Sequence, residues 1–232
     1  MNVSRDAGTR GVGAVPPDSG LPVKPRLRGV LHQYAFFVSV ALGAALVVLA
    51  PGGRARLAAA IYAFAVSGLL GTSALYHRIT WRPRARTWMR RLDHSMIFVL
   101  IAGTYTPFAL VVLHGGLAHA ILIVVWAGAF GGIVLKMLWT NHPKWLSAVV
   151  YISLGWVAVI AMPDIARALG PLALALLVGG GLLYTAGAII YAAERPNPIP
   201  RVFGYHEIFH ALVVAAAAAH FAVVAFYALP RG

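Results

Sequence analysis

Long apolar runs separated by short polar links are the dominant pattern along this chain. Seven runs can cross a hydrocarbon core of about 30 Å, which takes roughly 20 residues of helix. They fall near residues 30–50, 57–77, 92–113, 117–139, 145–162, 171–193 and 205–228. Because the links are short, consecutive helices should be antiparallel neighbours. The pattern therefore predicts an all-α membrane protein built as a seven-transmembrane helix bundle.

Glycines and one proline interrupt the apolar runs. Gly128 and Gly132 are one turn apart in the fourth run, and residues 179–181 are three consecutive glycines in the sixth. Small residues let membrane helices approach closely, so we expect tight helix packing at these positions. Pro107 in the third run lacks a backbone N–H and is expected to kink its helix.

Composition agrees with a membrane protein and narrows the chemistry. The 232 residues are 60% hydrophobic and 11% charged, with a mean hydropathy of +0.80, whereas a soluble domain carries roughly a quarter charged residues. There is no cysteine, which excludes disulfides, thiol nucleophiles and cysteine-bound metals. The net charge of +13 is concentrated in the tail and in short links, so it indicates membrane topology rather than nucleic-acid binding.

The distribution of basic residues predicts the orientation of the bundle. Residues 1–29 have no apolar periodicity and are expected to form a disordered tail, followed by the membrane domain at 30–232. Fifteen of the 19 Lys and Arg residues lie in this tail or in the links after the second, fourth and sixth runs. The positive-inside rule then puts the N-terminus in the cytoplasm and the C-terminus outside, in a multi-pass protein of the plasma (inner) membrane. The first run is expected to remain as an uncleaved span.

An H-E-x-x-H pattern opens the seventh run. His206 and His210 lie one helical turn apart on the same face, the spacing at which two imidazoles bind one zinc ion. Under the predicted topology, His77 at the end of the second run and Asp93 at the start of the third lie on the same cytoplasmic side. We therefore predict a zinc site with His77, His206 and His210 as ligands.

Two further residues are predicted to act at this site. Three imidazoles with an open fourth position are typical of catalytic zinc. Asp93 could orient or deprotonate a zinc-bound water, or could accept a hydrogen bond from a ligand imidazole. Ser73 lies one turn before His77 on the same face, so its hydroxyl can also point at the site.

The remaining histidines are given ordinary roles. His94 points about 100° away from Asp93 and is expected to face a loop or to pack. His220 falls within about 40° of the His206 face but too deep to share the ion; it either lines a polar cavity or, as we favour, bonds to a neighbouring helix. The Trp- and Arg-rich residues 81–91 are expected to anchor the protein at the interface, with contact to anionic lipid headgroups as the alternative. Four more histidines near helix ends are assigned no role: His32, His114, His119 and His142.

Several short motifs together resemble the progestin and adiponectin receptor superfamily, and most closely its bacterial branch, the hemolysin III family. Each motif is weak alone, but their order over residues 30–228 is specific. They are Ser73-Ala74-Leu75-Tyr76-His77, Arg91-Leu92-Asp93-His94-Ser95, Gly103-Thr104-Tyr105-Thr106-Pro107, His206-Glu207-Ile208-Phe209-His210 and His220-Phe221.

The resemblance implies a seven-helix fold with a cytoplasmic N-terminus. It also implies zinc (Zn2+) on His77, His206 and His210, with Asp93 bonded to the metal water and Ser73 beside it. Eukaryotic relatives are associated with ceramidase-like amide hydrolysis, whereas the bacterial branch carries a hemolysin name. The short tail has no counterpart of the hormone receptors' long N-terminal domain, so hormone sensing is not expected.

Three functions remain open from the sequence. The leading hypothesis is a zinc-dependent hydrolase acting on an amide or ester bond of a membrane lipid. The second is a non-enzymatic membrane protein with structural zinc, either a regulator of membrane homeostasis or a cytolysin. The third is an intramembrane metalloprotease with Glu207 as general base; it is disfavoured because no Asp follows Asp164 to complete such a site.

Overall fold

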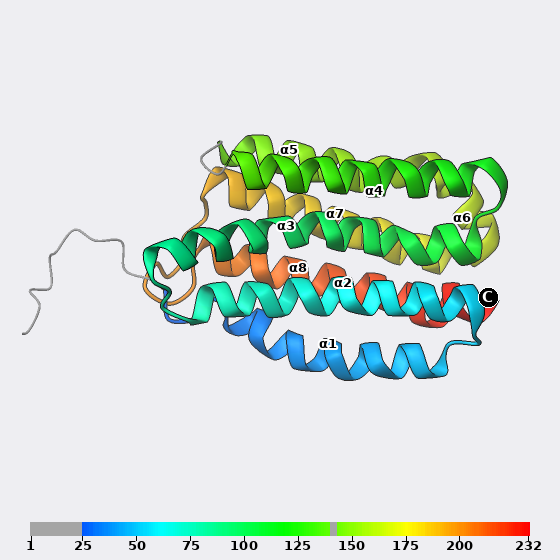
Figure 1. Cartoon of the computed structure of the whole chain (residues 1–232), viewed down its shortest axis with the longest axis horizontal. Coiled ribbons are helices and arrows are strands. Elements are labelled where there is room, and N and C mark those ends of the chain that lie inside the picture. The colour runs from blue at the N-terminus through cyan, green and yellow to red at the C-terminus, as the bar shows by residue number, and fades with distance from the viewer. Residues whose placement is uncertain (1–24, 140–142) are drawn as a thin grey trace, which may run out of the picture.

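The computed structural model describes residues 25–139 and 143–232, and every regular element longer than a single bridge in these ranges is helical. Seven helices of this part are long and apolar enough to cross a membrane, which confirms the predicted fold class. The helices are α1 (Val30–Leu49), α2 (Gly53–Arg78), α3 (Pro83–Pro107), α4 (Gly115–Leu138), α5 (Lys144–Gly155), α6 (Met162–Leu169), α7 (Pro171–Ala193) and α8 (Tyr205–Val223) (Figure 1). Helices α5 and α6, joined by the 3-10 turn Trp156–Ala161, form one span.

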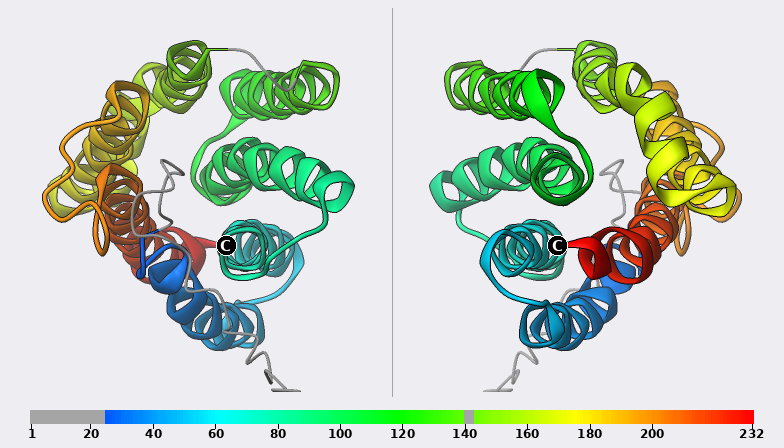
Figure 2. Two further views of the ribbon diagram at one scale, coloured as in Figure 1. Left: turned by 90° about the vertical axis from the view of Figure 1, so that its left-hand side faces the viewer. Right: turned by 90° about the vertical axis from the view of Figure 1, so that its right-hand side faces the viewer.

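Seen from either end, the helices form a ring (Figure 2). Each of the first four helices packs on the next, α5 packs on α7, α7 on α8, and α8 closes the ring against α1. The end of α2, the start of α3 and the start of α8 lie at the same end of the bundle (Figure 1). The topology therefore brings together the three segments that carry the predicted site residues.

Two predicted spans extend beyond their apolar runs. The third begins at Pro83 rather than near residue 92, so most of the basic stretch 81–91 is helical. Proline suits the first turn of a helix, where no partner for its missing N–H is needed. No glycine or proline lies between Pro83 and residue 92. The fifth span continues past Met162 through α6 to Leu169. Apolar length locates the hydrocarbon crossing, but a helix continues as far as its backbone bonding allows.

Close helix contacts occur at three of the predicted glycines, Gly128, Gly132 and Gly180, but not at Gly179, where no atom lies within 4 Å of an added Cβ. Gly132 of α4 faces the Phe98 ring of α3, where an added Cβ would lie 2.2 Å from a ring carbon. Gly128, one turn earlier, faces Leu154 of α5 instead. In α3, Pro107 is followed by the π-helical turn Phe108–Val112, which accommodates the interruption of the backbone bonding.

A short turn at residues 25–29 joins the start of the bundle to the α7–α8 link. The amides of Arg26 and Leu27 donate to the carbonyls of Arg201 and Val202 at 3.0 and 3.2 Å. Gly29 has φ +79°, and a Cβ there would lie 2.6 Å from the Cβ of His77, so this position requires glycine. Residues 1–24 of the predicted tail, like His142, lie outside the described residues.

Candidate functional site

Three histidines from two helices converge at one end of the bundle. His77 lies in the last turn of α2, and His206 and His210 lie in the first two turns of α8. One ligand nitrogen from each lies within 4.8 Å of the others, and the Nε2 atoms of His77 and His206 are 3.2 Å apart. Two nitrogens at 2.0–2.1 Å from a tetrahedral zinc are about 3.3 Å apart. The donor set and its spacing therefore fit a zinc ion.

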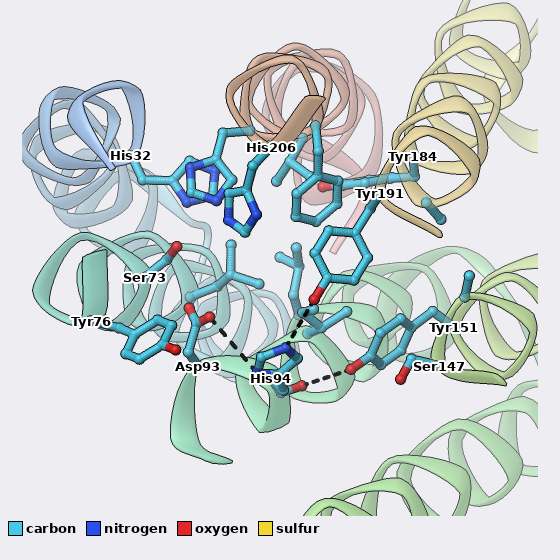
Figure 3. Close-up of a pocket in the computed structure, with 18 of the residues that line it drawn as sticks. His32, Ser73, Tyr76, Asp93, His94, Ser147, Tyr151, Tyr184, Tyr191 and His206 are labelled. Atoms are coloured by element: carbon cyan, nitrogen blue, oxygen red, sulfur yellow. Dashed lines mark hydrogen bonds and ion pairs between the residues drawn. The ribbon is translucent and has the colours of Figure 1, made fainter. Parts of the chain in front are cut away.

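Asp93 and Ser73 lie beside the three histidines. An Asp93 carboxylate oxygen is 3.8 Å from His77 Nε2, and the buried Ser73 hydroxyl lies next to the same carboxylate (Figure 3). Asp93 comes from α3 and Ser73 from α2, one turn before His77. The five residues predicted from the sequence are thus gathered in one place.

The cluster opens into a cavity of about 1140 Å³. Its lining comes from α2, α3, α4, α5, α7 and α8, together with the turn before α1 and His32 of α1. Apolar side chains such as Leu69, Leu100 and Val213 form part of the wall, which reaches as far as His220. Ligand pockets usually measure about 300–1,000 Å³ and are mostly apolar with a few polar groups. This cavity can hold a lipid-sized molecule.

A family model described as Haemolysin-III related matches residues 22–221. The chain belongs to the haemolysin-III family. It is 40% identical over 166 residues to the Hemolysin-3 homolog of Bacillus subtilis (strain 168), covering 71% of this chain and 75% of that protein. It is 35% identical over 196 residues to Hemolysin-3 of Bacillus cereus, covering 82% and 86%.

A more distant relative is the human Monocyte to macrophage differentiation factor, 24% identical over 173 residues, which cover 72% of this chain and 68% of that protein. This relative fits the predicted relation to the progestin and adiponectin receptor superfamily. The resemblance stated from the sequence is therefore confirmed at the level of the family.

In this haemolysin-III protein, a fourth imidazole lies against the histidine cluster, and its position was not predicted from the sequence. His32 of α1 is only 2% exposed and stacks on His210, with ring centroids 3.8 Å apart and planes 4° apart. Neither of its ring nitrogens has a hydrogen-bond partner among the described residues. The sequence did contain an indication of this position. His32 lies two residues into the first apolar run, at the same predicted depth as His77.

His94 also belongs to the cavity wall rather than facing a loop. Its Nε2 is 3.3 Å from the Tyr191 hydroxyl, and its Nδ1 is 2.6 Å from the Arg90 carbonyl oxygen. The Tyr151 hydroxyl donates to the His94 carbonyl oxygen at 3.2 Å. Figure 3 shows His94 joining α3 to Tyr191 of α7 and Tyr151 of α5 across the cavity.

The acidic residue of H-E-x-x-H has a structural role. Glu207 is 1% exposed; its carboxylate accepts the Gly204 N–H at 2.8 Å, which caps α8, and it pairs with Arg28 in the turn before α1. A carboxylate engaged by these two donors is not available to the histidine cluster as a general base. This geometry argues against the metalloprotease hypothesis.

His220 bonds to a neighbouring helix, as predicted. Its Nε2 is 3.1 Å from the Leu177 carbonyl oxygen of α7. Gly180 makes the approach possible, since a Cβ there would lie 2.4 Å from the His220 ring. His220 also lines the far part of the cavity.

Proposed function

We propose that this membrane protein is a zinc-dependent hydrolase that acts on an amide or ester bond of a membrane lipid. The observation that carries the proposal is the grouping of three imidazole nitrogens within 4.8 Å, with the Asp93 carboxylate beside them, at the wall of a cavity of about 1140 Å³. Three imidazoles with a nearby carboxylate are suited to hydrolysis, and the apolar wall is suited to an acyl chain.

In this proposal, each residue of the cluster has a chemical task. His77, His206 and His210 hold the zinc, which supplies Lewis-acid polarisation of a carbonyl and activation of water. Asp93 accepts the proton released during attack and returns it to the leaving group. Ser73, beside the Asp93 carboxylate, keeps that side chain pointed at the reacting atoms.

Membership of the family gives partial support. The eukaryotic superfamily members associated with ceramidase-like activity share the motif pattern that carries these five residues. The two bacillary relatives are named for haemolysis instead. A cytolysin would be favoured over a hydrolase if the purified protein lyses red cells and a variant without zinc lyses them equally well.

The test combines metal analysis with lipid turnover on the same purified samples. We expect one zinc per chain in the wild type and loss of zinc in His77→Ala, His206→Ala and His210→Ala. His119→Ala is the matched control, because that imidazole is exposed and hydrogen-bonds to the Gly115 carbonyl oxygen in its own helix. Hydrolysis of amide and ester lipids should disappear with the zinc. Unchanged zinc content in all three variants would overturn the metal site.

Asp93→Asn separates catalytic from structural zinc. Structural zinc has four protein ligands, and Asp93 is close enough to His77, at 3.8 Å, for a small shift to make it the fourth. A catalytic role predicts that Asp93→Asn keeps the zinc and loses turnover by about a hundred-fold or more. Loss of zinc affinity in this variant, with no lipid turned over by the wild type, would establish the structural alternative.

A further inference from the structure

The cavity extends far beyond the histidine cluster along α8. Its lining includes both His206 and His220, which are 14 residues apart on this helix. At 1.5 Å per residue they are about 21 Å apart along the helix axis, which is roughly two-thirds of a 30 Å hydrocarbon core. A group bound beside His220 therefore cannot contact the proposed metal site, and a ligand that fills the cavity must be elongated.

Several polar side chains line the far end of the cavity, and most of them are bonded within the protein. The Tyr105 hydroxyl donates to the Gly155 carbonyl oxygen at 2.6 Å, and Trp156 Nε1 donates to the Thr185 hydroxyl at 2.9 Å. Thr185 in turn donates to the Gly181 carbonyl oxygen at 2.8 Å. These bonds join α3 to α5, and the turn after α5 to α7, so helix packing accounts for these side chains.

Two polar atoms at this end have no hydrogen-bond partner among the described residues. His220 Nε2 is 3.1 Å from the Leu177 carbonyl oxygen, which can only accept, so Nε2 carries the hydrogen and the neutral ring has Nδ1 as an acceptor. This Nδ1 is buried and unpartnered. The Tyr184 hydroxyl of α7 is also without a partner, on a half-buried side chain at the cavity wall (Figure 3). The Tyr184 and His220 rings are in contact, with centroids 5.5 Å apart.

Helix packing does not account for this pair. A phenylalanine in place of Tyr184 would fill the same space without bringing a hydroxyl into an apolar helix bundle. An unpaired polar group in such surroundings is costly, because it loses hydrogen bonds to water and gains none in return. His220 lines the cavity, so a ligand in contact with its ring lies close to Nδ1. A ligand that pairs both groups would remove this cost.

We propose that Tyr184 and His220 form a subsite for a hydroxyl group on the chain of the lipid that fills the cavity. A hydroxyl is the smallest group that accepts from the Tyr184 O–H and donates to His220 Nδ1. As a statement about the substrate of hydrolysis, the inference rests on the proposed function. As a statement about binding, it rests on the cavity alone.

The distance to the histidine cluster sets the place of this hydroxyl on the chain. By helical rise, His220 is about 15 Å from His210 and about 21 Å from His206. An extended chain covers about 1.2 Å per bond, so this distance corresponds to roughly 12–18 bonds. The ligand class is therefore a long-chain lipid with a hydroxyl near the end of its chain.

The test measures the Kd of three fatty acids of equal chain length for the full-length protein in neutral detergent. They are palmitic acid, its derivative with a hydroxyl on the terminal carbon, and its derivative with a hydroxyl on the carbon next to the carboxyl group. We expect the terminal hydroxyl to tighten binding about ten-fold over the other two acids. Tyr184→Phe should remove this preference and leave the binding of palmitic acid unchanged. Tyr227→Phe is the matched control and should keep the preference, because Tyr227 is half-buried in the turn after α8 and is not among the described residues that line the cavity.

Three results would overturn the subsite. They are equal Kd values for all three acids, which would mean that water occupies the pair, equal Kd values for the two hydroxy acids, or an equal loss of all three acids in Tyr184→Phe, which would indicate a packing role. If Tyr184→Phe does not fold, His220→Phe tests the same difference. The titrations are repeated after chelation of zinc. A preference for the terminal hydroxyl that survives chelation supports the subsite even where no hydrolysis is found, whereas hydrolysis without this preference overturns the subsite alone.

Discussion

Replacement of Gly103 by alanine tests whether the α2–α3 contact is as close as the structure shows. Gly103 is buried in α3, and an added Cβ would lie 2.4 Å from the Cβ of Ala65 in α2. Carbon atoms in contact are normally about 3.5–4.0 Å apart, so the two helices must separate by about 1 Å. The Ala65 methyl group is fixed to the backbone and cannot rotate away. Overpacking costs about 1–3 kcal/mol, and the helix preference for alanine over glycine returns at most about 1 kcal/mol. We expect a net loss of about 1–2 kcal/mol.

The assay is the thermal unfolding midpoint of the full-length protein in one detergent. Gly131→Ala in α4 is the matched control, because no atom lies within 4 Å of its added Cβ, and it should be neutral or slightly stabilising. The double variant Gly103→Ala/Ala65→Gly removes the clashing methyl group and should recover most of the lost stability. If Gly103→Ala is as stable as Gly131→Ala, or if the double variant is no better than Gly103→Ala, the steric argument is wrong.

Three further predictions concern residues around the site. Glu207→Ala removes both the cap of α8 and the Arg28 pair, so it should lower stability by about 2–3 kcal/mol in chemical unfolding while zinc stoichiometry stays at the wild-type value; loss of zinc at unchanged stability would contradict the structural role. His32→Ala should weaken zinc affinity by roughly ten-fold in a competition titration, and His32→Phe, which keeps the stacked ring on His210, should stay near the wild type; equal losses would show that stacking is not what matters. Gly180→Ala should lower the unfolding midpoint by displacing the His220 ring, whereas Gly179→Ala, with no atom within 4 Å of its added Cβ, should not; the reverse order would contradict the described α7–α8 contact.

The sequence was sufficient for the spans and for the main cluster. Apolar length located seven helices, and the alternation of their direction brought His77, Asp93 and His206 to one end without any knowledge of packing. The rotation of each helix about its own axis, which decides which side chains face inward, could not be derived in the same way. A helix that is apolar on all sides carries no stripe that tells which face points inward. The inward orientation of His32 and His94 therefore depends on how α1 and α3 pack against their neighbours.

The start of α3 was mistaken for a related reason. A charged helical extension beyond the hydrocarbon core looks like a link when only hydropathy is considered. Pro83 in the first turn and the absence of glycine and proline from residues 84–92 were nevertheless compatible with a helix. The burial of Lys136 was not predicted either, because this residue was counted with the basic residues of a link. Its burial follows from the neighbouring Ser147 of α5, a contact between two different spans.

The separation of the three proposed zinc ligands along the chain has a consequence for biosynthesis. His77 and His206 are 129 residues apart, with four complete spans between them. During synthesis, His77 enters the membrane long before α8 has left the ribosome, so a partly inserted chain has only one of the three proposed ligand imidazoles and is not expected to hold the metal firmly. The proposed zinc site therefore predicts that metal loading follows insertion of the last helix, and that metal content distinguishes completely assembled molecules from truncated ones.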